Sequence, residues 1–169
     1  KGNYCIFHII LQNTVRESIL MEIERKYLVN APPADYHTWE AVQLEPAYLC
    51  TEPVVRVRRE NDSYVLTYTS TGLLAREAYD LPLTKEAYEH LLSKADGIII
   101  TKTRYKKPIS GTGLVVELDV FAGTYKGLMR AEVEVPNIEA AEHFVPPSWF
   151  GEDVTFSGKY QNSRLSQTR

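Results

Sequence analysis

Hydrophobic and polar residues alternate over many short stretches of this chain, which is the pattern of β-strands that have one buried face. In residues 21–29 (MEIERKYLV), side chains two apart share a face, so Glu22, Glu24 and Lys26 lie together and mostly uncharged residues lie between them. We expect a strand there and seven more at residues 47–51, 54–60, 63–69, 73–83, 98–107, 113–121 and 128–135.

Helical spacing is weaker and is confined to short segments. Residues 34–44 carry spaced apolar residues that predict a short helix, and residues 138–144 predict another. The clearest helix begins after Thr84, a good N-cap, and its apolar stripe ends at Gly97. The prediction is an α+β domain with an eight-stranded, mostly antiparallel sheet that can close into a barrel with a few flanking helices.

Composition describes an ordinary globular protein. The 169 residues are 44% hydrophobic and carry a net charge of -3, which argues against nucleic acid or a membrane surface as a partner. No apolar run reaches the roughly 18 residues of a membrane span. Cys5 and Cys50 are too few for a disulfide scaffold, so we expect a reducing, cytoplasmic setting. Residues 1–20 are expected to be an extension without functional role, and residues 21–169 the functional domain.

Charged residues recur two apart within the expected strands, and most strands carry one sign. A solvated outer face is one explanation; charges facing a shared interior are the other. Like charges on one face repel, so we favour an interior in which cations and carboxylates surround a ligand. Phosphate with Mg²⁺ or Mn²⁺ suits both charge sets. The residues are Glu22/Glu24/Lys26, Arg56/Arg58, Arg76, Lys102/Arg104, Glu117/Asp119 and Glu132/Glu134.

An ordered set of motifs resembles one known family. MEIERKYLV resembles the ExExK signature of the CYTH superfamily, the triphosphate tunnel metalloenzymes, and the likeness continues to about Leu165. The further matching segments are VVRVRRE, SYVLTYT, LLAREAYDLPL, ITKTRY, VVELDVF, GLMRAEVEV, PPSWFGEDVTF and GKYQNSRL. The chain looks most like bacterial members that hydrolyse short inorganic polyphosphates, in a closed eight-stranded barrel with a charged tunnel.

The resemblance implies roles for individual residues and a Mg²⁺ or Mn²⁺ cofactor. Glu22, Glu24 and Lys26 would be catalytic. The phosphate-binding cations would be Lys26, Arg56, Arg58, Arg76, Lys102, Arg104 and Lys159. The metal ligands would be Glu22, Glu24, Glu132 and Glu134, supported by Glu117 and Asp119. The implied reaction is metal-assisted hydrolysis of a phosphoanhydride bond, without a covalent intermediate.

Three positions depart from the family pattern. Thr69 stands where the family commonly has a lysine, Ala78 where it has a glutamate, and Ser157 where it often has an aspartate. These changes leave several functions open: an inorganic triphosphatase that also accepts nucleoside triphosphates, a class IV adenylyl cyclase, a thiamine triphosphatase, or a polyphosphate-binding protein with weakened or no catalysis. The expected partner is a small-molecule triphosphate or polyphosphate, and a homodimer is left open.

Overall fold

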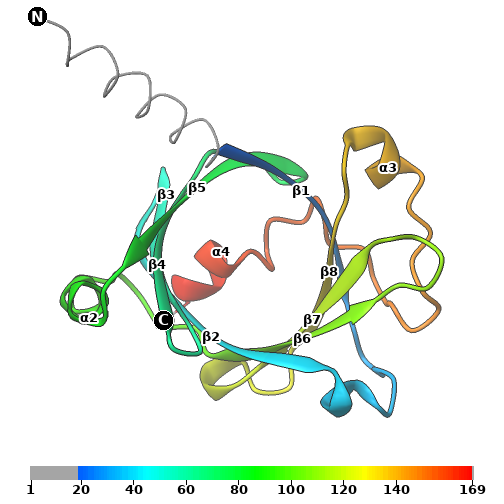
Figure 1. Ribbon diagram of the computed structural model, residues 1–169, viewed down its shortest axis with the longest axis horizontal. Coiled ribbons are helices and arrows are strands. Elements are labelled where there is room, and N and C mark those ends of the chain that lie inside the picture. The colour runs from blue at the N-terminus through cyan, green and yellow to red at the C-terminus, as the bar shows by residue number, and fades with distance from the viewer. Residues whose placement is uncertain (1–18, 169) are drawn as a thin grey trace, which may run out of the picture.

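Eight antiparallel strands close into a barrel in the computed structural model, which describes residues 19–168 (Figure 1). The order around the barrel is β1-β5-β4-β3-β2-β6-β7-β8, so β1 pairs with both β5 and β8. The predicted closed α+β barrel is therefore confirmed. The strands are β1 (Ile19–Leu28), β2 (Glu40–Thr51), β3 (Val54–Glu60), β4 (Ser63–Thr69), β5 (Ala75–Leu83), β6 (Lys102–Pro108), β7 (Val115–Phe121) and β8 (Met129–Glu134).

Short helical segments accompany the barrel, and α4 differs from α2 and α3 in where it lies. Seen along the barrel axis, α4 lies within the ring of strands, whereas α2 and α3 lie outside it (Figure 1). The predicted N-cap is confirmed, because the Thr84 hydroxyl accepts a hydrogen bond from the amide of Ala87 at 3.2 Å. The helical segments are η1 (Tyr36–Thr38), α2 (Lys85–Leu92), η2 (Gly123–Tyr125), α3 (Ile138–Glu142) and α4 (Asn162–Ser166).

The helix predicted at residues 34–44 is wrong. Only the single turn η1 forms there, and the chain enters β2 at Glu40. The first half of β2 pairs with β6, from Glu40 opposite Lys106 to Leu44 opposite Lys102. This pairing closes the barrel between two distant segments, and that long-range contact outweighs the local apolar spacing. The strand predicted at 47–51 is thus the second half of β2.

Other boundaries differ by a few residues. The helix after Thr84 ends at Leu92 instead of near Gly97. Residues 98–101 are not part of β6; instead, the amide of Ile98 donates to the carbonyl of Ser166 at 2.8 Å. At the other end, β1 begins at Ile19, two residues before the boundary expected at Met21. Most of the expected extension, residues 1–18, lies outside the described residues.

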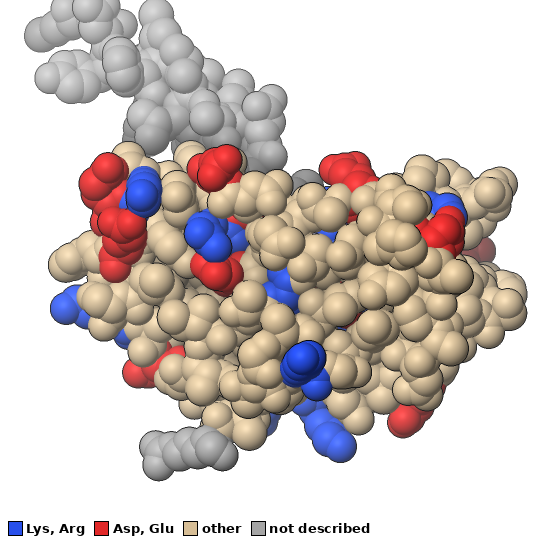
Figure 2. Space-filling model, turned by 90° about the horizontal axis from the view of Figure 1, so that it is seen from below, with Lys and Arg blue, Asp and Glu red and all other residues tan. Residues whose placement is uncertain are grey.

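The outer face of the barrel is apolar where helices and loops cover it. Val57 packs with Tyr88 of α2, and Leu118 and Val133 pack beneath α3 and the segment around Trp149. On the side shown in Figure 2, charged side chains are scattered in small groups, and no large patch of one sign covers this face. Across residues 19–168, no helix has the length and apolar character that crossing a membrane requires.

Candidate functional site: the charged lumen

The charged residues that recur two apart within the strands face the inside of the barrel. Two cavities occupy this lumen, one of about 500 Å³ beside α4 (the α4-side cavity) and one of about 190 Å³ (the carboxylate-side cavity). Arg56, Arg76, Glu132 and Asn162 line both, so the cavities are two parts of one space. The carboxylate-side cavity is also lined by Glu22, Glu24, Arg58, Lys102, Arg104, Glu117 and Glu134, and the α4-side cavity by Lys26 and Arg130. The inward orientation predicted from the alternation is confirmed.

One wall of the lumen is a buried network of ion pairs around Asp119 on β7. Asp119 is fully buried, and Arg104 donates to both of its oxygens at 2.7 and 2.9 Å. The ammonium of Lys102 also contacts Asp119. Burial alone would raise the pKa of Asp119, but Arg104 and Lys102 outweigh burial and hold that pKa below its usual value. Asp119 therefore serves as counter-charge to these cations.

Lys102 is the cation most affected by its surroundings. Its side chain is 2% exposed. Burial lowers the pKa of Lys102 to about 8, because the attraction of Asp119 only partly offsets the lost hydration and Arg104 adds repulsion. The charge of this lysine is therefore sensitive to mildly alkaline pH.

Arg76 and Lys26 form a second network with the ExExK carboxylates. Arg76 donates to Glu22 at 3.1 Å and to Glu24 at 3.0 Å, while the Lys26 ammonium lies 2.7 Å from Glu24. Burial and Glu132 would raise the pKa of Glu24, but Lys26 and Arg76 outweigh them and lower it. Glu24 is thus ionised and already neutralised by two cations.

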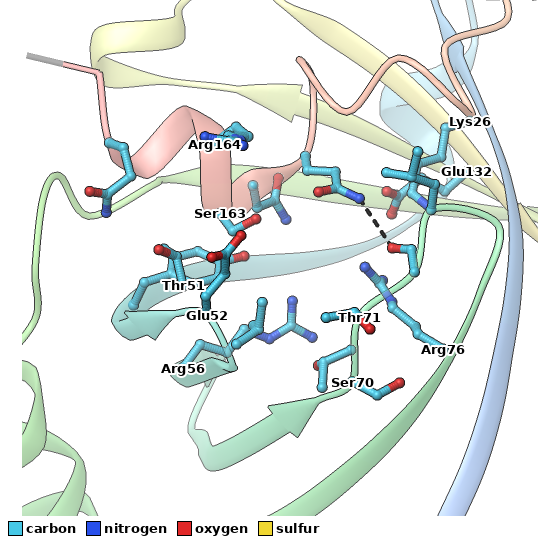
Figure 3. Close-up of a pocket in the computed structure, with 18 of the residues that line it drawn as sticks. Lys26, Thr51, Glu52, Arg56, Ser70, Thr71, Arg76, Glu132, Ser163 and Arg164 are labelled. Atoms are coloured by element: carbon cyan, nitrogen blue, oxygen red, sulfur yellow. Dashed lines mark hydrogen bonds between the residues drawn. The ribbon is translucent and has the colours of Figure 1, made fainter.

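Arg56 differs from its neighbours because it has no carboxylate partner among the described residues. It points into the α4-side cavity from β3, as Arg76 does from β5 (Figure 3). Its buried Nε has no hydrogen-bond partner in the described part of the chain. Arg58, two residues on, is neutralised by Glu60 at 2.7 Å. Arg56 therefore offers the lumen a guanidinium that is free to bind an anion.

The acidic end of the lumen lies where β1 and β8 pair. Glu134 is directly opposite Glu24 in the strand register. Partial burial raises the pKa of Glu134, and the nearby carboxylates of Glu24 and Glu22 raise it further. A divalent cation would relieve this repulsion, and carboxylate oxygens are the ligands that Mg²⁺ and Mn²⁺ prefer.

The carboxylates suit such a metal in chemistry but are engaged elsewhere. Within residues 19–168, no three His, Cys, Asp or Glu side chains are grouped closely enough to hold a metal ion. Glu24 is held by Lys26 and Arg76, and Glu132 contacts Arg104 and Arg130. Metal binding would therefore exchange some of these cations for the ion.

Several residues singled out in the sequence lie away from the lumen. Lys159 is exposed, its ammonium lies 5.1 Å from the centre of the Tyr160 ring, and it lines neither cavity. Ser157 is also exposed. Glu117 does line the carboxylate-side cavity, where it contacts Arg104 and Lys106.

Sequence reasoning missed several residues that line the lumen, among them Arg130 and Asn162. Arg130 lies two positions before Glu132 on β8, so the period-two rule that found Glu132 and Glu134 could have found it as well. Asn162 begins α4 and lines both cavities. No local pattern marks Asn162, because α4 reaches the lumen only through the tertiary fold.

Two sequence relatives of this chain are described as inorganic triphosphatases. None of the protein-family models matches this chain. An inorganic triphosphatase of Nitrosomonas europaea is 38% identical over 151 residues, which cover 87% of this chain and 97% of that protein. An inorganic triphosphatase of Acetivibrio thermocellus is 36% identical, covering 85% and 92%. The crystal structure of an inorganic triphosphatase superposes with a TM-score of 0.67 at 35% identity, covering 89% and 97%. The chain therefore belongs to the inorganic triphosphatase family, within the CYTH or triphosphate tunnel proteins.

Proposed function

We propose that this protein hydrolyses a phosphoanhydride bond of inorganic tripolyphosphate inside the barrel lumen, with Mg²⁺ or Mn²⁺ as cofactor. Its relatives are inorganic triphosphatases, and it shares their barrel. Nucleoside triphosphates are the secondary substrates that we would test, because they present the same phosphate chain.

The observation that carries this proposal is that Arg56 lines both cavities and has no carboxylate partner in the part of the chain that the structure describes. An arginine fork binds phosphate oxygens through two hydrogen bonds at once, and it does so best where water is scarce. Lys26 and Arg76 line the same cavity, so their positive charges would also attract a polyanion bound to Arg56 (Figure 3). Arg58, Lys102 and Arg104 line the adjoining carboxylate-side cavity.

Hydrolysis of such a bond requires charge neutralisation and alignment more than covalent chemistry from the protein. Lys26, Arg56 and Arg76 would bind the phosphoryl oxygens and hold the phosphate chain in one orientation. Glu22, Glu24 and Glu134, with Glu132 beside them, would hold the metal. When bound, the metal ion adds positive charge to the phosphoryl oxygens and lowers the pKa of a coordinated water. Glu24 would orient the attacking water from the carboxylate side.

The lining of the lumen favours an inorganic substrate over one with a large organic group. Tyr48 is the single aromatic residue among the described residues that line the two cavities, and it is 2% exposed. A nucleobase or a thiamine ring commonly stacks on an exposed aromatic side chain, and the lumen offers none within residues 19–168. The cyclase and thiamine triphosphatase alternatives thus lack a visible binding surface.

Phosphate release from tripolyphosphate, ATP and thiamine triphosphate, each with Mg²⁺ and with Mn²⁺, tests the proposal. We expect release from tripolyphosphate to be fastest and to stop when EDTA is added. Glu24→Ala should lower release at least about 100-fold. Glu77→Ala is the matched control, because Glu77 is exposed on the outer side of β5 and should leave the rate unchanged. Binding of tripolyphosphate without release from any substrate would instead select the non-catalytic alternative.

A further inference from the structure

Arg130 is a buried guanidinium at the place where β8 meets the segment that carries α4. It is 1% exposed, and it borders the α4-side cavity. An unpaired charge at such a depth would be strongly unfavourable, so its contacts must compensate for the lost hydration. Four groups do so: the carboxylates of Glu132 at 2.9 Å and Asp119 at 3.3 Å, the side-chain oxygen of Asn162 at 3.1 Å, and the carbonyl of Tyr160.

These four acceptors belong to two different parts of the molecule. Glu132 and Asp119 are carboxylates of the barrel wall, whereas Tyr160 and Asn162 belong to the C-terminal segment around α4. The helix itself has five residues and is far too short to be stable without tertiary contacts. Arg130 therefore joins α4 directly to the charged wall of the lumen.

The other anchors of the α4 segment do not reach the lumen carboxylates. The Tyr125 hydroxyl donates to the carbonyl of Leu165 at 2.5 Å, and the amide of Ile98 donates to the carbonyl of Ser166 at 2.8 Å. The Gln161 amide donates to the carbonyl of Gly72 at 3.4 Å. Among the hydrogen bonds of residues 19–168, those of Arg130 alone connect α4 to an acidic residue of the lumen.

Glu132 is held from two sides. Arg130 contacts one of its oxygens, Oε1, and Arg104 contacts the other, Oε2. A carboxylate bound at both oxygens by two rigid guanidinium groups has a single orientation. Removal of Arg130 would free one oxygen of Glu132 and, at the same time, remove the contact between α4 and the lumen carboxylates.

We propose that Arg130 is a positioning residue that holds Glu132 and α4 together. It thereby fixes the position of the acidic wall of the lumen relative to the α4 end of the lumen. Its Nη1 and Nη2 groups are bound to protein acceptors, and only its Nε has no hydrogen-bond partner among the described residues, so it acts through Glu132 and α4 and not by binding phosphate. The kinetic consequence rests on the proposed function, whereas the mechanical link between Glu132 and α4 does not.

The kinetic test compares Arg130→Lys with Tyr125→Phe. A lysine keeps the charge but lacks the fork that reaches four acceptors, so we expect kcat for tripolyphosphate to fall about tenfold or more with KM changed little. Tyr125→Phe removes an anchor of α4 outside the lumen, so it should lower the melting temperature and leave kcat unchanged. A raised KM at constant kcat in Arg130→Lys would show direct contact with substrate and would overturn the proposal. A lowered melting temperature with both constants unchanged would also overturn it.

A second test needs no activity. Hydrogen exchange of the α4 amides reports how firmly the helix is held; the amide of Leu165, for example, donates to the carbonyl of Gln161 at 2.9 Å. We expect Glu132→Gln to speed this exchange severalfold, and to add nothing further in an Arg130→Lys background. An exchange rate of the α4 amides that Glu132→Gln leaves unchanged would refute the link between Glu132 and α4. If the wild-type protein released no phosphate, the proposed function would fail while this result would still decide the role of Arg130.

Discussion

Thr69 and Ala78 lie directly opposite each other across strands β4 and β5, and each is 4% exposed. Thr69 also lines the α4-side cavity. The resemblance to the triphosphate tunnel family implies a lysine and a glutamate at these two positions. A lysine and a glutamate here would form a cross-strand ion pair, whereas this chain carries an uncharged pair.

The neutral pair predicts the behaviour of two variants. Thr69→Lys alone buries an ammonium without a cross-strand partner, so it should lower the melting temperature. The double variant Thr69→Lys/Ala78→Glu should recover that stability and lower the KM for tripolyphosphate about tenfold, because it adds a cation to the cavity wall. Thermal melts and initial rates of phosphate release would check both effects. If the double variant is no more stable than Thr69→Lys, the two side chains do not pair.

A second prediction separates the two faces of β3. Arg56 points into the lumen without a carboxylate partner in the described residues, whereas Arg59 lies on the outer face, 2.9 Å from Glu45. Arg56→Ala should raise the KM for tripolyphosphate about 100-fold, because a desolvated phosphate contact is lost. Arg59→Ala removes the same residue type from the same strand and should leave kinetics unchanged. Equal effects of the two substitutions would contradict an anion-binding role for Arg56.

The pH dependence of tripolyphosphate hydrolysis should follow the ionisation of Lys102. Its pKa of about 8 means that its positive charge disappears as the pH rises through this value. We therefore expect kcat/KM for tripolyphosphate to fall above pH 8, since this ratio reports the ionisation of the free enzyme. Lys102→Arg, which stays charged, should shift that alkaline limb to higher pH.

Stability should move in the opposite direction over the same pH range. The pKa of Lys102 is lower in the folded protein than its ordinary value of 10.5, so between about pH 8 and 10.5 the unfolded chain binds more protons. The contribution of this residue to the free energy of unfolding therefore rises with pH in that window. Denaturant titrations at pH 7.5 and 9.5, on the wild type and on Lys102→Met, would isolate this contribution. A loss of activity that coincided with unfolding would argue against the assignment.

Metal affinity should depend on Glu134. This carboxylate has a raised pKa through burial and its acidic neighbours, and no ion pair joins it to a cation within residues 19–168. Glu134→Gln removes one negative charge from that end of the lumen and should raise the Mg²⁺ concentration needed for half-maximal activity about tenfold. Glu139→Gln, on exposed α3, is the control. Unchanged metal dependence in Glu134→Gln would place the metal elsewhere.

The strand alternation predicted the faces of the barrel well. In a pleated strand, residues two apart must share a side, so the spacing of Glu132 and Glu134, or of Arg56 and Arg58, already determines that each pair faces the same way. The structure then shows that the charged face points into the lumen and that the uncharged neighbours are covered by helices and loops on the outer face. The ranges of the β3–β4 hairpin could be read from the sequence for the same local reason.

Contacts between distant segments could not be read in this way. The length of β2 depends on its pairing with β6, about 60 residues later in the chain, and that pairing turned an expected helix into strand. The isolation of Arg56, the engagement of Asp119 by three cations and the reach of Arg130 to α4 all depend on strand register and on where the C-terminal segment packs. The sequence by itself determined which residues share a face of each strand, because the alternation of side-chain direction is a property of the strand. Only the tertiary structure decided which charges neutralise each other and which remain free for a ligand, because ion pairing depends on distances between strands that are far apart in the chain.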